Sequence, residues 1–380
     1  MTHEMIFTNA RLVLADAVLD GTLVVRNGMI AEVQRGRSHV AGAEDMHGDV
    51  LMPGMVDVHT DNLERQVLPR ANARWPSRSA LLAHDAQCVA AGVTTVLDAL
   101  CLGDLGFDPG RGQTFRDGVR DLDEMRAACG LKAEHYLHLR CELPAPDLLP
   151  ALDSVADHAQ VVMVSLMDHS PGVGQYRDLE RYREMRMRQK GLSVQDVESR
   201  IEELLAQRER LREPQRRVVL DRFSARGIPL ASHDDDNAAD VARNAADGIM
   251  ISEFPVAMEA AAATRAHGVT VIGGAPNIVR GGSHSGNLAV ADLVQAGLLD
   301  AFASDYVPSA MIEAAWRAAE LPGCSLPQAV AMVSDAPARM AKLSDRGRLA
   351  VGLRADVVRV QTLAGLPVLR GVWSRGVRVA

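Results

Sequence analysis

The sequence feature that most constrains the fold is a regular alternation of short apolar runs with helical patterns through the middle of the chain. The apolar runs have the length of buried strands, and each is followed by a stretch with apolar residues at helical spacing. Eight strand–helix repeats are the number that a (β/α)8 TIM-like barrel requires, so we predict that architecture. The expected strands are 55–59, 93–97, 135–141, 161–167, 228–232, 249–252, 269–272 and 301–304.

Both ends of the chain are rich in residues that favour strands. Near the N-terminus, apolar runs at 23–26 and 29–33 flank Asn27 and Gly28, a dipeptide typical of a two-residue hairpin turn. The C-terminal stretch has the same character at 355–360 and 368–379. Two β-rich ends around a different middle indicate a second, smaller unit that both termini build together.

We therefore expect an α/β protein with two domains. A small β-sandwich domain comprises residues 1–52 and 346–380, and the barrel spans 53–345. A helical insertion dense in Arg and Glu interrupts the barrel at about 176–223. The charges of this insertion are typical of a solvated helix face with pairs between successive turns.

The overall charge excludes some classes of partner. A net charge of -8 and a pI near 5.8 argue against a nucleic-acid-binding or anionic-membrane surface. The first residues lack a secretory signal, the apolar runs are too short for a membrane span, and the five cysteines form no C-x-x-C pair. We expect a cytoplasmic protein with reduced thiols, and the sequence leaves open whether it forms a homo-oligomer.

Polar side chains follow the predicted strands at their carboxyl ends, the face of a barrel that carries active sites. His59 and Asp61 lie two apart on one strand, so both can face one ion. Histidine and carboxylate ligands suit zinc or a similar divalent metal, and six of them suffice for one or two ions. The candidate ligands are His59, Asp61, Glu142, His169, His233 and Asp305.

Each candidate also has an ordinary interpretation. An isolated His at a strand end is more often a hydrogen-bonded residue than a ligand, but three on one face favour a metal. Asp305 also fits a turn or a helix cap. The aspartates 234–236, which follow His233, fit either a supporting role or an N-cap run that opens the next helix.

A glycine-rich segment at 273–287 predicts an anion site. Such a loop exposes backbone N–H groups, and a guanidinium and hydroxyl beside them would hold a phosphate group. A glycine-rich turn without a ligand is the alternative. Arg140 is expected to project into the barrel beside Glu142. The candidate substrate-binding residues are Arg140, Asn277, Arg280, Gly281, Gly282, Ser283 and His284.

Several runs resemble motifs of the amidohydrolase superfamily and, more narrowly, of its PhnM family of α-D-ribose 1-methylphosphonate 5-triphosphate diphosphatases. The resemblance extends through almost the whole chain, at 53–64, 83–86, 92–98, 138–144, 165–172, 231–235, 274–287, 304–306 and 352–356. The superfamily pattern implies a barrel with one or two metal ions and usually a His-x-His pair on the first strand. This chain has His59-x-Asp61 instead.

The resemblance implies metal-dependent hydrolysis of a phosphorylated sugar, in the carbon–phosphorus lyase pathway of phosphonate catabolism. The 5-triphosphate of ribose 1-methylphosphonate would yield the 5-phosphate and pyrophosphate. Asp305 would deprotonate the attacking water, Glu142 would bridge the ions, and Arg280 would hold the polyphosphate or phosphonate end. The alternatives are an amidohydrolase that cleaves a C–N bond of a cyclic amide or N-acyl substrate, and a non-catalytic binding protein.

Overall fold

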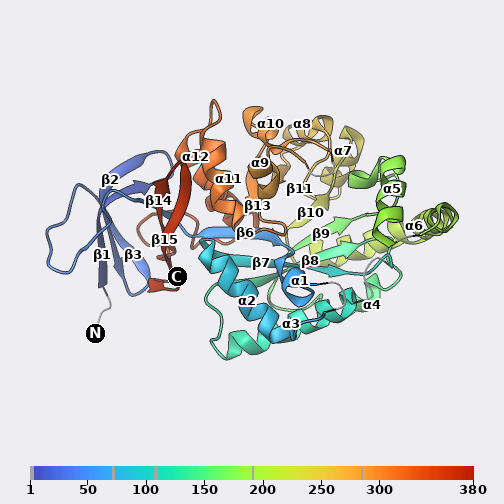
Figure 1. Cartoon of the computed structure of the whole chain (residues 1–380), viewed down its shortest axis with the longest axis horizontal. Helices are drawn as coiled ribbons and strands as arrows, with labels where there is room; N and C mark the ends of the chain where they lie inside the picture. The colour runs from blue at the N-terminus through green and yellow to red at the C-terminus, as the bar shows by residue number, and fades with distance from the viewer. Residues whose placement is uncertain (1–3, 71–72, 107–109, 191, 284–285) are drawn as a thin grey trace.

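The computed structural model describes residues 4–70, 73–106, 110–190, 192–283 and 286–380. These residues form a barrel with a helical layer around it and a separate sheet on one side (Figure 1). The barrel strands are β6 (Met55–Thr60), β7 (Val93–Leu102), β8 (Glu134–Glu142), β9 (Val161–Met167), β10 (Leu230–His233), β11 (Ile251–Glu253), β12 (Thr270–Gly274) and β13 (Ala301–Ala303).

The longest of the helices that accompany the barrel is α6, in the charged insertion. They are α1 (Asn62–Val67), α2 (Ser77–Ala90), α3 (Arg111–Ala127), α4 (Leu148–Asp153), α5 (Leu179–Lys190), α6 (Val194–Ser224), α7 (Ala238–Ala246), α8 (Met258–Ala266), α9 (Ala275–Arg280), α10 (Val290–Gln295), α11 (Ala310–Ala319), α12 (Leu326–Ala331) and α13 (Asp335–Met340), with a 3₁₀ turn at Gly174–Tyr176. In the described part of the chain, none of these helices combines the length and apolar character needed to cross a bilayer.

The barrel strands run parallel in sequence order from β6 to β13, which confirms the predicted architecture. A parallel bridge between Thr60 and Asp305 joins the first strand to the last. Asp305 N donates to His59 O at 3.0 Å, and Asp61 N donates to Asp305 O at 2.5 Å. The closure of the barrel therefore runs through the residues of the predicted metal centre.

The expected strand positions agree with the observed ones, with differences of one or two residues at most ends. The largest difference is in β7, which continues five residues beyond the expected end at 97. Asp98 is the polar residue that interrupts the apolar pattern there. Its carboxylate is fully buried and accepts hydrogen bonds from His84 and His135, so the strand continues through it.

The terminal strands form one hydrogen-bonded sheet in the order β16-β15-β14-β5-β1-β2-β3, with β4 beside β1. Its members are β1 (Glu4–Val13), β2 (Val18–Arg26), β3 (Met29–Arg35), β4 (Glu44–Asp45), β5 (Val50–Pro53), β14 (Val357–Leu363), β15 (Leu366–Ser374) and β16 (Val377–Arg378). The predicted hairpin turn is confirmed, since Asn27 and Gly28 have φ values of 50° and 78° between β2 and β3. Both termini thus contribute to one sheet, as expected.

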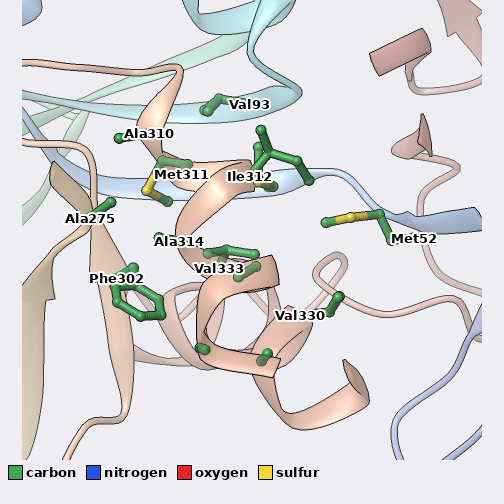
Figure 2. Close-up of a cluster of buried hydrophobic side chains, with 14 of the residues drawn as sticks. Met52, Val93, Ala275, Phe302, Ala310, Met311, Ile312, Ala314, Val330 and Val333 are labelled. Carbon is green, nitrogen blue, oxygen red and sulfur yellow. The ribbon is translucent and has the colours of Figure 1, made fainter. Parts of the chain in front are cut away.

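A buried apolar cluster connects this sheet to the barrel (Figure 2). It brings together Met52 of β5, Phe302 of β13 and Met311 of α11, all fully buried, with Val330 and Val333 beside them. The side chains come from the terminal sheet, the barrel wall and the covering helices. The cluster therefore fixes the terminal sheet against the outside of the barrel, away from its mouth.

The charged segment that follows β9 is helical, and α5 and α6 lie on the far side of the barrel from the terminal sheet (Figure 1). Helix α6 begins at a capping box in which Ser193 and Asp196 bond reciprocally. Arg208 and Arg212 both donate through Nε to Asp168, at 2.6 and 3.0 Å. These bonds anchor the long helix beside the end of β9.

Candidate metal centre

Two groups of candidate ligands gather at the carboxyl ends of the barrel strands. The first comprises His59 and Asp61, from β6 and the residue after it, and Asp305, which follows β13. Their donor atoms lie within 4.8 Å of one another. His59 Nε2 is 3.6 Å from Asp61 Oδ1. Because Thr60 and Asp305 are paired across the closure of the barrel, strands one and eight bring these donors together.

The second group comprises His169, which follows β9, His233, which ends β10, and Asp234, which follows β10. His233 Nδ1 lies 3.2 Å and His169 Nε2 lies 3.8 Å from Asp234 Oδ2. The His233 ring is centred 5.5 Å from that of His169 and 5.7 Å from that of His59. The two groups are therefore neighbours, an arrangement suited to a pair of ions.

The chain takes an unusual backbone conformation within two residues of the ends of three barrel strands, β10, β11 and β13. Asp234, Phe254 and Asp305 have φ values of 58°, 53° and 56°. Residues with a Cβ atom rarely adopt positive φ, and those that do often cluster at functional sites. Asp234 and Asp305 are both candidate ligands, so the backbone is strained at the residues that orient these carboxylates.

Two glutamates contact the Nδ1 atoms of histidines in the site. Glu253 Oε1 lies 3.0 Å from His59 Nδ1, and Glu142 Oε2 lies 2.5 Å from His169 Nδ1. Although burial alone would raise the pKa of Glu142, the neighbouring His169 holds it below its ordinary value. A carboxylate on the second ring nitrogen is the usual support of a metal-binding histidine. Glu142, expected as a bridging ligand, contacts His169 Nδ1 in this structure, and its role as a ligand stays a prediction.

The donors present fit divalent cations. Nitrogen and oxygen donors of this kind are those that zinc and similar metals use in catalytic sites. His233 Nδ1 is buried yet makes no hydrogen bond within the described part of the chain. A buried polar atom without a partner is costly, and an ion between His233 and Asp234 would satisfy it. Burial and the nearby Asp61 carboxylate raise the pKa of Asp305 to about 6, a sign of crowded negative charge.

Arg140 lies at the same mouth. Its Nη1 donates to Asp61 Oδ1 at 2.5 Å, and the side chain is almost fully buried. The expectation that Arg140 points into the barrel beside Glu142 thus agrees with its position on β8. The guanidinium supplies positive charge next to the first ligand group.

The predicted anion loop borders the same site. A cavity of about 100 Å³ is lined by Asp234 and Asp305 together with Arg280, Gly282 and Ser283 of the loop. Gly281 ends α9 with a φ of 80°, a conformation that favours glycine. His284 lies outside the described residues.

Asn277 also lines this cavity, but its amide is committed to the loop itself. Its Nδ2 donates to Leu288 O at 3.0 Å, and its Oδ1 accepts from Val290 N at 2.9 Å. Asn277 therefore shapes the loop, and its expected contact with the substrate stays a prediction.

The sequence did not assign Asp234 as a ligand or Glu253 as a support. Asp234 belongs to the second ligand group, and Glu253 holds His59. The aspartates 234–236 do not cap the next helix, because Asn237 accepts from Asp240 N at the start of α7. The signal for both missed residues is their position: Asp234 follows a strand that ends in His233, and Glu253 ends β11.

The chain matches no family model. It is 42% identical over 377 residues to the alpha-D-ribose 1-methylphosphonate 5-triphosphate diphosphatase of Escherichia coli strain K12, an alignment that covers 99% of this chain and 100% of that protein. The chain belongs to this diphosphatase family. This identity confirms the family resemblance inferred from the sequence motifs.

Solved structures of other enzymes share the fold of this chain. N-isopropylammelide isopropylaminohydrolase from Burkholderia multivorans superposes with a TM-score of 0.63 at 20% identity, covering 100% of this chain and 98% of the other. The 5-methylcytosine deaminase from Klebsiella pneumoniae has a TM-score of 0.64 at 15% identity, covering 100% and 97%. At these identities the likeness establishes the shared fold alone.

Proposed function

We propose that the chain hydrolyses α-D-ribose 1-methylphosphonate 5-triphosphate to the 5-phosphate and pyrophosphate in phosphonate catabolism. One observation carries the proposal beyond family membership. The cavity that contains Asp234 and Asp305, one carboxylate from each ligand group, also contains Arg280 and the anion loop. Candidate metal ligands and a phosphate-binding loop thus meet in one place, as a polyphosphate substrate requires.

The proposed cofactor is a pair of divalent ions, with zinc as the expected metal. His59, Asp61 and Asp305 would hold one ion, and His169, His233 and Asp234 the other. When bound, such ions lower the pKa of water and neutralise charge on phosphate oxygens. Glu253 and Glu142 would orient His59 and His169 through their second ring nitrogens.

The residues around the metal centre have different roles in the reaction. Asp305 orients the attacking water and accepts its proton, while Arg280, Gly282 and Ser283 hold the polyphosphate. The water oxygen bonds to the α-phosphorus as the bond from that phosphorus to the oxygen bridging it to the β-phosphorus breaks. Pyrophosphate departs with that oxygen, and the 5-phosphate stays on the sugar.

The proposal is tested with purified protein, zinc or manganese, and the triphosphate in water enriched in ¹⁸O. We expect equal amounts of pyrophosphate and 5-phosphate by ³¹P NMR, with the label in the 5-phosphate, because attack occurs at the α-phosphorus. Label in pyrophosphate would overturn the assigned point of attack. Turnover of dihydropyrimidines or N-acyl amino acids without turnover of the triphosphate would overturn the proposed function in favour of C–N cleavage.

A further inference from the structure

We infer that a buried chain of hydrogen-bonded side chains positions Asp61, and that Asn62 and His84 are positioning residues of the metal centre. The chain comprises Asp85, His135, Asp98, His84 and Asn62, and is called the buried histidine chain below. The inference rests on the proposed function, because it treats Asp61 as a ligand. None of these five residues belongs to either ligand group of that centre.

The buried histidine chain connects helix α2 and strands β7 and β8 to helix α1 behind the metal centre. Asn62 Nδ2 lies 2.9 Å from His84 Nδ1, and His84 Nε2 lies 2.8 Å from Asp98 Oδ1. His135 lies 2.8 Å from the other Asp98 oxygen and 3.2 Å from Asp85. All five side chains are buried, with Asn62 only 2% exposed. Such a chain is rigid because each link has a partner on both sides.

The direction of every hydrogen bond in this chain is consistent. The Asn62 amide nitrogen donates to Gln87 Oε1, and the Asn62 amide oxygen accepts from Gln66. These two bonds fix the orientation of the amide. The Asn62 nitrogen therefore also donates in its contact with His84. His84 Nδ1 therefore accepts, and its Nε2–H donates to Asp98. His135 donates from both nitrogens, to Asp98 and Asp85. His84 Nε2 and His135 Nδ1 thus both carry protons, which favours a hydrogen-bonded chain over a second metal site at His84, Asp98 and His135.

The buried histidine chain acts on Asp61 through Asn62, the next residue in the sequence. Asp61 directly precedes α1, and Asn62 is the first residue of that helix. The backbone of Asp61 is held on one side by its 2.5 Å bond to Asp305 O, and the side chain of Asn62 holds the other side. Since α1 spans only Asn62–Val67, it is too short to be stable without contacts that fix its start. Loss of the Asn62–His84 bond would let Asp61 move relative to His59.

The test compares a variant that removes the Asn62 amide with one that removes only an exposed partner of that amide. Asn62→Leu removes the donor to His84, whereas the control Gln87→Leu removes only the exposed acceptor and leaves the amide oriented by Gln66 and His84. Zinc affinity is measured by competition with a chromophoric chelator, without substrate. We expect a loss of about tenfold for Asn62→Leu, the lower end of the effect of removing residues that support metal ligands, and less than about twofold for Gln87→Leu.

Asp98→Asn, which keeps the shape of the side chain, provides a second variant in case Asn62→Leu does not fold. It should also weaken zinc binding, because one histidine loses its acceptor. Wild-type zinc affinity in either folded variant, even with a lower unfolding temperature, would overturn the inference and leave the chain a purely structural element. Failure of the wild-type protein to bind zinc or manganese would instead overturn the proposed metal centre.

Discussion

Glu253 Oε1 lies 3.0 Å from His59 Nδ1, and both side chains are fully buried inside the barrel. The other oxygen of Glu253 accepts from Ser165 Oγ, which also bonds to His138. With Nδ1 of His59 donating to Glu253, the Nε2 lone pair faces Asp61 and Asp305. The glutamate thus selects the ring nitrogen that is available to a metal.

Replacing Glu253 with Gln should weaken metal binding while keeping the size of the side chain. An amide interacts less favourably than a carboxylate with the imidazole, so we expect a tenfold to hundredfold lower metal affinity. Metal content after dialysis against graded chelator concentrations measures this loss. Glu320→Gln, on the exposed end of α11, serves as the control and should behave like the wild type. Unchanged metal content in Glu253→Gln would contradict the supporting role.

Removing the guanidinium of Arg280 should weaken binding of the triphosphate. Arg280 lines the cavity shared with Asp234 and Asp305, and a charge-assisted bond to phosphate contributes about 1.5–3 kcal/mol. We therefore expect KM for the triphosphate to rise at least about tenfold in Arg280→Ala, with unchanged metal content. The matched control is Arg37→Ala, an exposed arginine outside the barrel. An unaltered KM in steady-state assays would exclude Arg280 from the substrate site.

Replacing Glu134 should destabilise the junction between the barrel and the terminal sheet. Glu134 begins β8 and pairs with Arg346 and Arg375 at 2.7 Å, and also with Arg354. Glu134→Ala leaves three guanidinium groups without their shared carboxylate, two of them almost fully buried. We expect a loss of about 2–4 kcal/mol, measured by urea denaturation. Stability equal to that of the wild type would mean that water replaces the carboxylate without cost.

The buried His135 should make stability depend on pH above neutrality. Although burial alone would lower the pKa of His135, the carboxylates of Asp98 and Asp85 raise it to about 9. A raised folded-state pKa adds stability that is fully present below the unfolded value near 6.5 and is lost as pH rises through 9. Between pH 6.5 and 9.5, the wild type should lose on the order of 2 kcal/mol more than His135→Gln. Parallel pH profiles in urea denaturation would contradict the charged state of His135.

The sequence was sufficient to predict the barrel because its parallel strands are covered on both faces and therefore appear as short apolar runs. It was also sufficient to place candidate ligands at strand ends. It could not distinguish a ligand from a support, because Glu142 and Asp234 both follow the expected pattern. Only the side-chain geometry puts Glu142 behind His169 and Asp234 beside it.

The buried histidine chain shows a second limit of sequence reasoning. His84, Asp98 and His135 come from one helix and two strands and meet only in the folded protein. The domain boundaries at 52/53 and 345/346 also stay a proposal, since β5 and β6 are separated by a single residue. Limited proteolysis at these positions would test them.

The bridge between Thr60 and Asp305 gives the metal centre a mechanical consequence. The barrel has a seam where its first and last strands meet, and Asp61 and Asp305 stand on opposite sides of it. An ion shared by these carboxylates would act as a clasp across that seam. Removal of the metal would then weaken the contact between β6 and β13. Chelation would therefore both abolish catalysis and make the barrel open more readily between these two strands.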